Sequence, residues 1–177
     1  LKTNVDFELI IVDNGVESGE VFTSLLESFP FPLSLIKSHF NRNYALGNNL
    51  GSSYAKGDYL LFLNNDTIVT DYCFDKLLES SAPEVGIVGC KLLYYDSGLI
   101  QHAGVAWVGP YAPFHCFLNY PPEHFLVNQT RRVQAVTGAC LLIRSDLFKK
   151  VVGFCSDFIN ELEDLFLCKQ VLQLGYK

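Results

Sequence analysis

The alternation of apolar strands and helices between residues 8 and 94 constrains this sequence more than any other feature. The first and third strands, at 8–12 and 59–63, are continuous apolar runs that end in short polar residues. Continuous runs are typical of strands whose two faces are both covered by helices. We therefore predict an α/β fold built on a mostly parallel sheet. The predicted strands span 8–12, 33–36, 59–63 and 85–94, and the predicted helices span 18–29, 46–55 and 71–80.

The second half of the chain is less regular. Candidate strands span 100–108 and 133–143, and candidate helices span 146–151 and 160–174. The stretch from Ser97 to Pro122 carries no charge, but its glycines and prolines interrupt the ~20 apolar residues that a membrane-spanning helix needs. We therefore predict no transmembrane segment, and a loop rich in proline and aromatic residues between two strands.

Length and charge restrict the class of protein further. The 177 residues are the size of one domain, and 13 Lys and Arg against 19 Asp and Glu give a formal net charge of −6. This acidic balance argues against nucleic acid as a partner, because binding it requires a basic surface.

The chain has no Met, so Leu1 is not an initiator residue and we expect a piece of a longer protein. The six cysteines form no CxxC pair, and we interpret them as buried free thiols in a reducing compartment.

Short polar side chains follow two of the predicted strands. Asp13 and Asn14 end the first strand, and Asn64, Asn65 and Asp66 follow the third. Ligands bind at the carboxyl ends of strands in open α/β sheets, so these residues are placed to bind a divalent cation or a polar ligand. The competing interpretation, that Asp and Asn simply favour turns, is equally well supported. A phosphoryl-transfer domain also has acidic groups at strand ends, but Asn64 stands where its nucleophilic Asp is needed.

The segment from Asn41 to Gly51 is rich in asparagine and contains a second glycine, Gly47. Each glycine inside a helix costs ~1 kcal/mol relative to alanine. This cost indicates that the backbone approaches another group closely. We interpret the segment as a loop and helix that face a ligand, and the alternative is an Asn-rich loop followed by a helix face of small residues.

Two acidic residues open the last predicted helix. Asn160 as the N-cap and Glu163 three residues later match a capping box, which explains Glu163 without any function. Capping explains Asp164 less easily. A helix N-terminus also stabilises an ionised carboxylate, as a general base requires, so Asp164 is a candidate for that role.

Taken together, these segments resemble the family 2 glycosyltransferases of GT-A fold, and within them the rhamnosyltransferase-like branch. The resemblance covers almost the whole chain, in the family's order. The matching segments are Ile11–Asn14, Asn41–Gly51, Phe62–Thr67, Lys91–Val105 with Gln101–Gly104, Val133–Arg144, and Gly153–Phe154 with Glu163–Asp164. In that order they resemble the motif that reads the nucleotide base, a loop and helix, the metal-binding DxD equivalent, a strand pair, a strand that approaches the donor sugar, and the block that supplies the catalytic base.

The resemblance implies a Rossmann-like GT-A fold with a mostly parallel central sheet and helices on both faces, truncated at the N-terminal strand and at the C-terminal end. It implies one domain, with residues 1–95 as the nucleotide-sugar-binding half and 96–177 as the acceptor and catalytic half. The implied activity is inverting transfer of a sugar from a UDP- or dTDP-sugar to a hydroxyl of a saccharide or lipid-linked saccharide, in the synthesis of cell-surface polysaccharide. The implied location is the cytoplasm, including peripheral association with the inner face of the membrane.

The resemblance also assigns roles to individual residues. Asp164 is expected to be the general base, with Glu163 as the second choice, and Asp66 with Asn64 is expected to hold Mg²⁺ or Mn²⁺. The residues expected to bind the nucleotide sugar are Asp13, Asn14, Asn41, Asn48, Asn65, Gly138 and Ala139, and those expected at the acceptor are His102, Trp107 and His115.

The sequence departs from the family pattern at several positions. Asn43 replaces the usual Gly of the loop, and Asn is the next best residue at positive φ. Cys155–Ser156 replace an Asp-Glu pair, Phe166 replaces the second acid of the last helix, and Lys169 replaces Arg. These departures leave a second interpretation open, which is a catalytically inactive fold that binds a nucleotide sugar.

Overall fold

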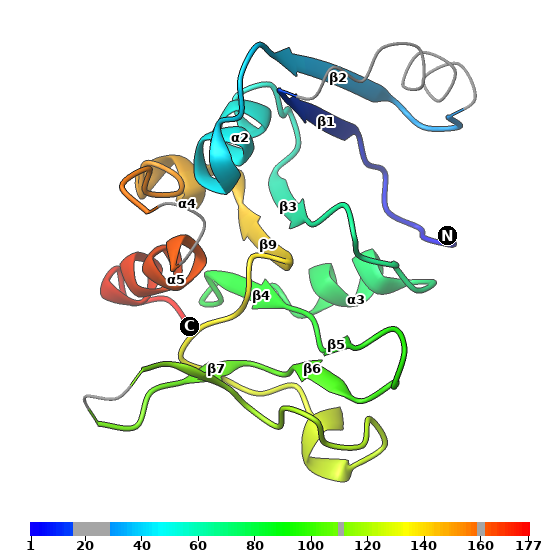
Figure 1. The fold of residues 1–177 in the computed structure, drawn as a ribbon, viewed down its shortest axis with the longest axis vertical. Coiled ribbons are helices and arrows are strands. Elements are labelled where there is room, and N and C mark those ends of the chain that lie inside the picture. The colour runs from blue at the N-terminus through cyan, green and yellow to red at the C-terminus, as the bar shows by residue number, and fades with distance from the viewer. Residues whose placement is uncertain (16–28, 110–111, 159–161) are drawn as a thin grey trace.

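A computed structural model describes residues 1–15, 29–109, 112–158 and 162–177 (Figure 1). The strands are β1 (Leu9–Asn14), β2 (Leu33–Ser38), β3 (Tyr59–Leu63), β4 (Ile87–Gly89), β5 (Leu92–Leu93), β6 (Ile100–His102), β7 (Val105–Ala106), β8 (Phe114–His115) and β9 (Cys140–Arg144). The helices are α2 (Asn43–Ser52), α3 (Cys73–Glu79), α4 (Ser145–Lys150), α5 (Glu163–Gln173) and the 3-10 helix η1 (Phe125–Asn128). The helix predicted at 18–29 lies almost entirely outside the described residues. Within the described residues, no helix is long and apolar enough to cross a membrane.

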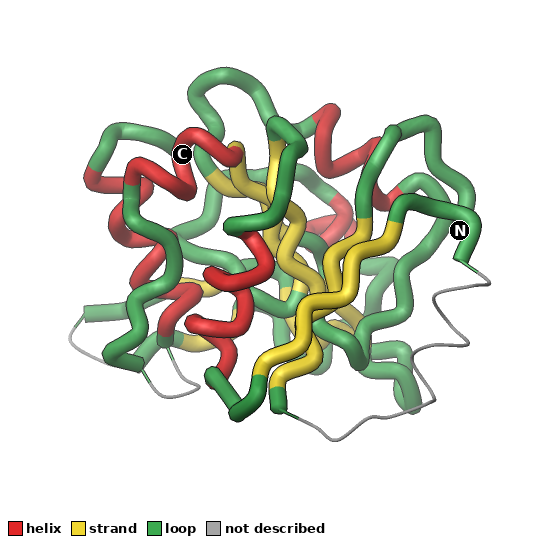
Figure 2. The backbone as a smooth tube through the Cα atoms, turned by 90° about the horizontal axis from the view of Figure 1, so that it is seen from above, coloured by secondary structure: helices red, strands yellow, loops and turns green. Residues whose placement is uncertain are grey.

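The longer strands form a parallel pair and a three-stranded unit. β1 and β2 run side by side in the same direction, from Leu9 opposite Leu33 to Asn14 opposite Ser38 (Figure 2). β9 lies between β3 and β4 and is antiparallel to both, so β3 and β4 share one direction. The mostly parallel order that we expected is therefore interrupted by an antiparallel strand from the second half of the chain. The alternation of strands and helices before residue 95 contains no signal for such a late strand.

Helices cover both faces of the three-stranded unit, as predicted. Leu60 and Phe62 of β3 pack with Ile143 of β9 in the main core, together with residues of α4 and α5. The alternate residues Leu61 and Leu142 pack in a second core against α3. Figure 1 shows α2, α4 and α5 on one side of β3 and β9, and α3 on the other. Burial of each such side chain contributes ~1.5–3 kcal/mol, which explains why both faces of these strands are apolar.

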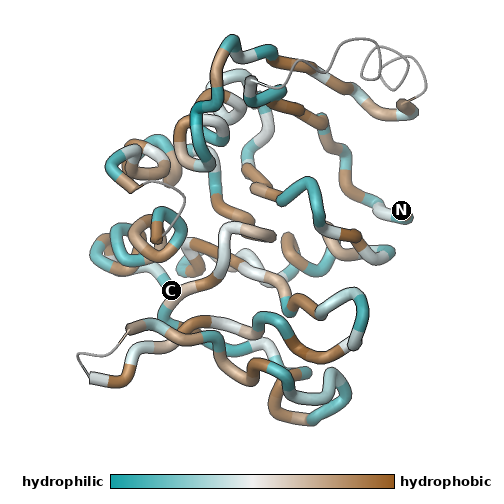
Figure 3. Tube along the Cα trace, in the orientation of Figure 1, coloured by the Kyte–Doolittle hydropathy of each residue, from teal (hydrophilic) through white to brown (hydrophobic). Residues whose placement is uncertain are grey.

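Three aromatic rings join β3 to the end of α4. The Phe62 ring lies 4.9 Å from the Phe148 ring and 4.8 Å from the Phe154 ring, and Phe148 and Phe154 are 5.4 Å apart. Tilted and edge-to-face pairs at these distances contribute ~0.5–1.5 kcal/mol beyond their buried area. Figure 3 shows that hydrophobic residues are frequent along β1 and β3.

Two predicted strands are divided in the structure. The strand predicted at 85–94 becomes β4 and β5, because the chain leaves β9 after Gly89 and then pairs with β6. The strand predicted at 100–108 becomes β6 and β7, with Gly104 between them at a φ of +106°. A Cβ atom on Gly104 would lie 2.5 Å from the Val133 side chain, so this bend requires glycine.

The other helices lie close to their predicted positions. α2 and α3 overlap the helices predicted at 46–55 and 71–80, and α4 begins one residue before its predicted start. α5 begins at Glu163 rather than at residue 160, after Leu162 with a φ of +69°. The capping box predicted between Asn160 and Glu163 falls partly on residue 160, which lies outside the described residues.

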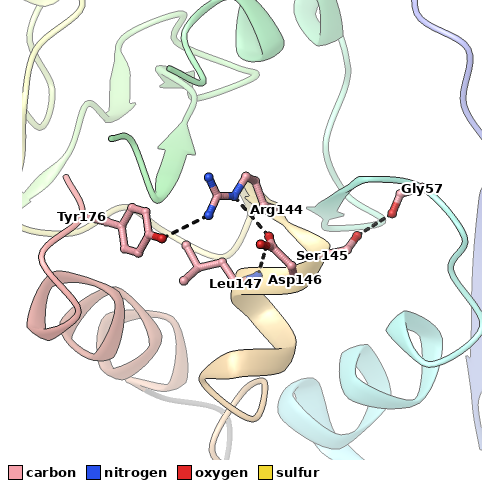
Figure 4. Close-up of polar contacts among 6 residues, drawn as sticks. All are labelled: Gly57, Arg144, Ser145, Asp146, Leu147 and Tyr176. Atoms are coloured by element: carbon pink, nitrogen blue, oxygen red, sulfur yellow. Dashed lines mark hydrogen bonds and ion pairs between the residues drawn. The ribbon is translucent and has the colours of Figure 1, made fainter. Parts of the chain in front are cut away.

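Polar contacts hold the junction between β9 and α4 (Figure 4). The Asp146 carboxylate accepts hydrogen bonds from the Leu147 backbone N–H at 2.8 Å and from Arg144 Nε at 3.2 Å. Arg144 also donates to the Tyr176 hydroxyl at 3.2 Å, which ties the junction to the segment after α5. These contacts connect the end of β9 to the start of α4 and to the segment after α5.

Candidate active site

Asp164 lies where two cavities meet, beside the segment that leads into β9. One cavity has a volume of about 190 Å³ and the other of about 270 Å³. Residues that line the smaller one are Tyr44, Asn64, Thr137, Gly138, Ala139, Leu162, Glu163 and Asp164. The larger one is lined by Val105, Pro113, Phe114, His115, Thr137, Leu162, Asp164 and Leu165. We call them the polar cavity and the aromatic cavity; Asp164, Thr137 and Leu162 border both.

Gly138 joins the two halves of the chain at the polar cavity. Its carbonyl accepts a hydrogen bond from the Tyr44 hydroxyl at 2.7 Å, and its backbone N–H donates to Asp164 Oδ2 at 2.7 Å. A Cβ atom at this position would lie 2.3 Å from the Tyr44 hydroxyl oxygen, so only glycine fits without movement. Because the Gly138 backbone bonds to side chains, the strand predicted at 133–143 begins only at Cys140. Ala139 continues the contact, as its carbonyl accepts from the Asn64 backbone N–H at 3.0 Å.

The two acidic side chains at the start of α5 differ in exposure. Glu163 is only 5% exposed and lines the polar cavity but not the aromatic cavity, whereas the partly exposed Asp164 lines both cavities. The second carboxylate oxygen of Asp164 accepts from the Leu165 backbone N–H at 2.7 Å. Backbone donors thus hold both oxygens of Asp164, and each keeps a lone pair for a further donor.

Tyr44 is a hydrogen-bond donor that the sequence analysis did not single out. Burial raises its pKa well above 10, and the nearby Asp164 and Glu163 charges raise it further. The hydroxyl therefore stays protonated and keeps its bond to Gly138. Tyr44 lies inside the asparagine-rich segment, where the sequence does not distinguish its hydroxyl from the many polar side chains around it.

A pair of histidines connects the aromatic cavity to the core. His102 is 1% exposed, and its Nδ1 lies 2.8 Å from Nδ1 of His115, which lines the cavity. His102 Nε2 accepts from the backbone N–H groups of Gly104 at 3.2 Å and Thr137 at 3.4 Å. Burial, with a smaller contribution from His115, lowers the pKa of His102 to about 4. Neutral His102 therefore carries its proton on Nδ1 and donates it to His115.

The polar residue at the end of β1 contacts a neighbouring loop, whereas Asn64 after β3 lines the polar cavity. The Asn14 amide donates to Asn41 Oδ1 at 3.1 Å and to the Asn43 carbonyl at 3.3 Å, and it accepts from the Arg42 backbone at 2.8 Å. Asn43 has a φ of +57°, so the loop keeps the conformation for which the family uses glycine. Asp13 is buried opposite Lys37 of β2. Among the described residues that line the two cavities, neither Asp13 nor the Asn14–Asn41 pair occurs.

The asparagines of α2 hold protein groups in this structure. The Asn48 amide donates to the Tyr44 carbonyl at 2.9 Å, one turn earlier. Asn49 binds the backbone of Phe154 at both ends, with its amide donating to the carbonyl at 2.8 Å and its oxygen accepting from the N–H at 2.9 Å. This double contact fixes the turn after α4, a role that the sequence analysis did not predict.

The remaining predicted residues are placed at different distances from the cavities. Asn64 lines the polar cavity, and Asn65 and Asp66 follow it as exposed residues of the same turn. Trp107 packs partly buried against the main core rather than lining the aromatic cavity. Pro113 and Phe114 line that cavity instead, and both belong to the proline and aromatic segment of the sequence.

A divalent cation at the polar cavity would have to be held partly by its substrate. No group of three or more His, Cys, Asp or Glu side chains in the described ranges is arranged to hold a metal ion on its own. Mg²⁺ is usually bound through one or two carboxylates together with substrate phosphates and water. The exposed carboxylate of Asp66, two residues after Asn64, meets that smaller requirement.

Comparisons with known proteins agree on the family. Residues 2–152 match the model of the family described as "Glycosyl transferase family 2". The chain is 36% identical over 167 residues to "O-antigen biosynthesis protein RfbC" of Myxococcus xanthus, and the match covers 86% of the chain and 12% of that protein. It is 33% identical over 174 residues to an "Uncharacterized glycosyltransferase" of Haemophilus influenzae, covering 97% of the chain and 54% of that protein. The chain thus spans about an eighth and about half of these relatives.

Solved structures agree on the fold. The mannosyltransferase PcManGT from Pyrobaculum calidifontis, in complex with GDP-Man and Mn²⁺, superposes with a TM-score of 0.67 at 17% identity over 96% of this chain and 44% of that one. GalNAc-T7 with UDP, GalNAc and Mn²⁺ superposes with a TM-score of 0.73 at 14% identity over 96% of this chain and 35% of that one. Similarity at this level of identity defines the fold alone, and it confirms the predicted GT-A architecture.

Proposed function

Because this chain belongs to glycosyl transferase family 2, we propose that it transfers a sugar from a nucleoside diphosphate sugar to a saccharide hydroxyl with inversion at the anomeric carbon. The observation that carries the proposal is the position of Asp164 between two cavities. An inverting transfer needs a base on one side of the anomeric carbon and a leaving group on the other. The polar cavity is assigned to the donor, and the aromatic cavity to the acceptor.

Asp164 acts as the general base in this proposal. Its Oδ2 accepts a hydrogen bond from the Gly138 N–H and its Oδ1 accepts one from the Leu165 N–H, so the carboxylate is held in one orientation. The free lone pairs accept the proton of the acceptor hydroxyl as that oxygen attacks. A general base of this kind contributes ~10²–10⁴ in rate. Glu163 is nearly buried on the donor side, and we assign it to the support of the polar cavity.

The donor side combines both halves of the chain. Residues 1–95 supply Tyr44 and Asn64, and residues 96–177 supply Gly138 and Ala139. Asp66 and Asn64 would hold Mg²⁺ or Mn²⁺, which when bound neutralises the charge that develops on the diphosphate leaving group. The remaining proposed donor contacts are Asp13, Asn14, Asn41, Asn48 and Asn65. Asn14 and Asn48 also form hydrogen bonds within the protein that stabilise the segment around Asn43 and Tyr44.

The acceptor side is formed by apolar and imidazole groups. Phe114 and Pro113 offer faces on which a sugar ring stacks, and His115 offers an N–H group to an acceptor oxygen. The name of the Myxococcus xanthus relative supports a cell-surface saccharide as the acceptor. We place the reaction on the cytoplasmic side of the membrane, where a UDP- or dTDP-sugar is the expected donor.

The alternative is a catalytically inactive domain that only binds the nucleotide sugar. It is favoured by Phe166, which occupies the position of an acid and packs against the Phe158 ring at 5.4 Å. Release of nucleoside diphosphate from UDP-, dTDP- and GDP-sugars, measured on the full protein with and without Mn²⁺, separates the two. Binding without turnover for every donor and acceptor would support the inactive domain.

Replacement of Asp164 tests the mechanism directly. Asp164→Asn should lower transfer ~10²–10⁴-fold and leave donor affinity nearly unchanged, because the amide keeps the shape but not the basicity. The matched control is Asp96→Asn, an exposed aspartate in the turn between β5 and β6. Transfer at the unaltered rate in Asp164→Asn would contradict the assignment of the base.

A further inference from the structure

Three cysteines from distant parts of the chain meet on the α3 side of the sheet. Cys73 is the first residue of α3, Cys90 directly follows β4, and Cys140 is the first residue of β9. The Sγ atom of Cys90 lies 3.1 Å from that of Cys140 and 3.6 Å from that of Cys73. The donor and acceptor chemistry described above uses none of these thiols. We call them the thiol cluster.

The strand register explains why two of the thiols face each other. Gly89 of β4 pairs with Leu141 of β9 in an antiparallel ladder, so the next residues, Cys90 and Cys140, lie opposite one another. The Cα atoms of directly opposed antiparallel residues are ~4.5–5.5 Å apart. The register therefore fixes the Cys90 sulfur beside Cys140, and Cys73 approaches the same Cys90 sulfur from α3 at 3.6 Å.

Of the three thiols, Cys73 is the one whose pKa is lowered by its neighbours. Hydrogen bonds from the Cys140 and Cys90 thiols lower the pKa of Cys73, and the Lys76 ammonium lowers it further, against an opposing effect of burial. The pKa of Cys90 is raised in turn, mainly by its hydrogen bond with Cys140. Cys73 and Cys90 are both partly exposed, whereas Cys140 is buried. Of the two partly exposed thiols, Cys73 is the one whose pKa is lowered, so we expect it to react first with a small oxidant.

The cluster is better suited to a disulfide than to a metal. Among the residues that the structure describes, no three such side chains have the arrangement of a metal site. Thiol–disulfide chemistry needs only a thiolate and a neighbouring thiol within reach, and Cys73 and Cys90 meet that condition.

We propose that the thiol cluster is an oxidation site for hydrogen peroxide, in which Cys73 is the attacking thiolate and Cys90 the resolving thiol. The Cys73 thiolate attacks one peroxide oxygen, which breaks the O–O bond and yields the Cys73 sulfenic acid and hydroxide. The Cys90 thiol then attacks the Cys73 sulfur. A Cys73–Cys90 disulfide forms, the sulfenic hydroxyl takes the thiol proton, and water leaves. The Cys73 thiolate and the Cys90 thiol are thus oxidised to one disulfide, and one peroxide is reduced to one water and one hydroxide. The hydroxide takes up from solvent the proton that Cys73 released when it ionised.

The sequence allows the product to be identified directly. Trypsin cleaves after Lys76, Lys91 and Arg144, so Cys73, Cys90 and Cys140 are released on three different peptides. The full protein is reduced, freed of reductant, treated with hydrogen peroxide, blocked with N-ethylmaleimide and digested without reduction. We expect mass spectrometry to find the Cys73 and Cys90 peptides linked, and dithiothreitol to separate them.

Rates identify the attacking thiol. Alkylation of Cys73 by iodoacetamide should be about tenfold faster at pH 7 than that of the free thiol N-acetylcysteine, because an ordinary thiol is only a few per cent ionised there. The Cys73 rate should stay flat between pH 6 and 8, while the rate of the free thiol rises. Cys73→Ser should remove the crosslink, and Cys90→Ala should leave Cys73 trapped as a sulfenic acid that dimedone labels. Cys155→Ser is the matched control and should form the crosslink normally.

Two results would overturn the proposal. One is the absence of any linked peptide after peroxide treatment of a protein whose circular dichroism spectrum is unchanged. The other is a Cys90–Cys140 link that forms equally fast in Cys73→Ser, because Cys73 would then not be the attacking thiolate.

Discussion

The two cavities that meet at Asp164 are built by different physical means. The polar cavity is held by hydrogen bonds to main-chain groups, of which the contacts of Gly138 with Tyr44 and Asp164 are the centre. The aromatic cavity is formed by ring faces and by a histidine that a buried histidine orients. Backbone hydrogen bonds fix the positions of donors and acceptors in the polar cavity, whereas ring faces set mainly the shape of the aromatic cavity. This difference agrees with the proposed assignment of the polar cavity to the donor and of the aromatic cavity to the acceptor.

After loss of the proposed base Asp164, the largest expected effect comes from adding one methyl group to the polar cavity. Gly138→Ala should lower transfer ~10²-fold, because the new Cβ would lie 2.3 Å from the Tyr44 hydroxyl and displace the segment that leads into β9. Steady-state kinetics and thermal unfolding measure the two consequences. Tyr44→Phe removes the clashing oxygen, so the double variant should recover part of the loss. A double variant no better than Gly138→Ala would show that the contact is not the cause.

The next effect concerns the histidine that supports the aromatic cavity. The pKa of His102 is about 4 in the folded chain against about 6.5 for an ordinary histidine, so the unfolded chain binds more protons between these values. The contribution of His102 to the free energy of unfolding should therefore be fully present above pH 6.5. It should be lost as the pH drops towards 4, which lowers the free energy of unfolding by about 3 kcal/mol at most. Urea unfolding at several pH values measures this slope. His102→Gln should flatten it, and an unchanged slope in that variant would contradict the assignment to His102.

A smaller effect is expected at the proposed metal ligand. Asp66→Ala should weaken Mn²⁺-dependent binding of UDP about tenfold, because the cation loses its protein carboxylate but keeps the phosphate oxygens. Calorimetric titration of the full protein with UDP, in Mn²⁺ and in chelator, measures it. The control is Asp71→Ala, another exposed aspartate after β3. Equal affinity in chelator for the unaltered protein would contradict a role for the cation.

The smallest effect is expected at the exposed member of the histidine pair. His115→Ala should raise the acceptor KM about fivefold and leave donor affinity unchanged, because it removes one hydrogen bond of ~1 kcal/mol. Measurement of KM for both substrates in the same assay checks this. A change confined to the donor KM would reverse the assignment of the two cavities.

Much of the framework was predictable because its signals are local. The apolar runs that became β1 and β3 alternate with helices, and their burial needs no knowledge of distant residues. The positive φ of Asn43 also follows from its place in a loop that usually carries glycine. Asp164 and Gly138 were identified through the family resemblance, and their contact in the structure is consistent with one site.

Other features could not be predicted, because they depend on which segments meet. Asp13–Asn14 and Asn64–Asp66 follow similar apolar runs, yet Asn14 binds the loop at Asn41–Asn43 and Asn64 lines a cavity. Trp107 was the expected aromatic of the acceptor site, but it packs against the core, and Phe114 lines the cavity instead. Composition and spacing do not distinguish these outcomes.

The sequence by itself determined the class of fold, the order of its longer strands and helices, and the family, because each rests on local periodicity or on short motifs. Only the tertiary structure decided that β9 inserts antiparallel between β3 and β4, since hydrogen bonds between strands join residues far apart in the chain. That insertion places Gly138 against Tyr44 and Asp164, and Cys140 against Cys90. The proposed base and the proposed oxidation site therefore both depend on one long-range strand pairing.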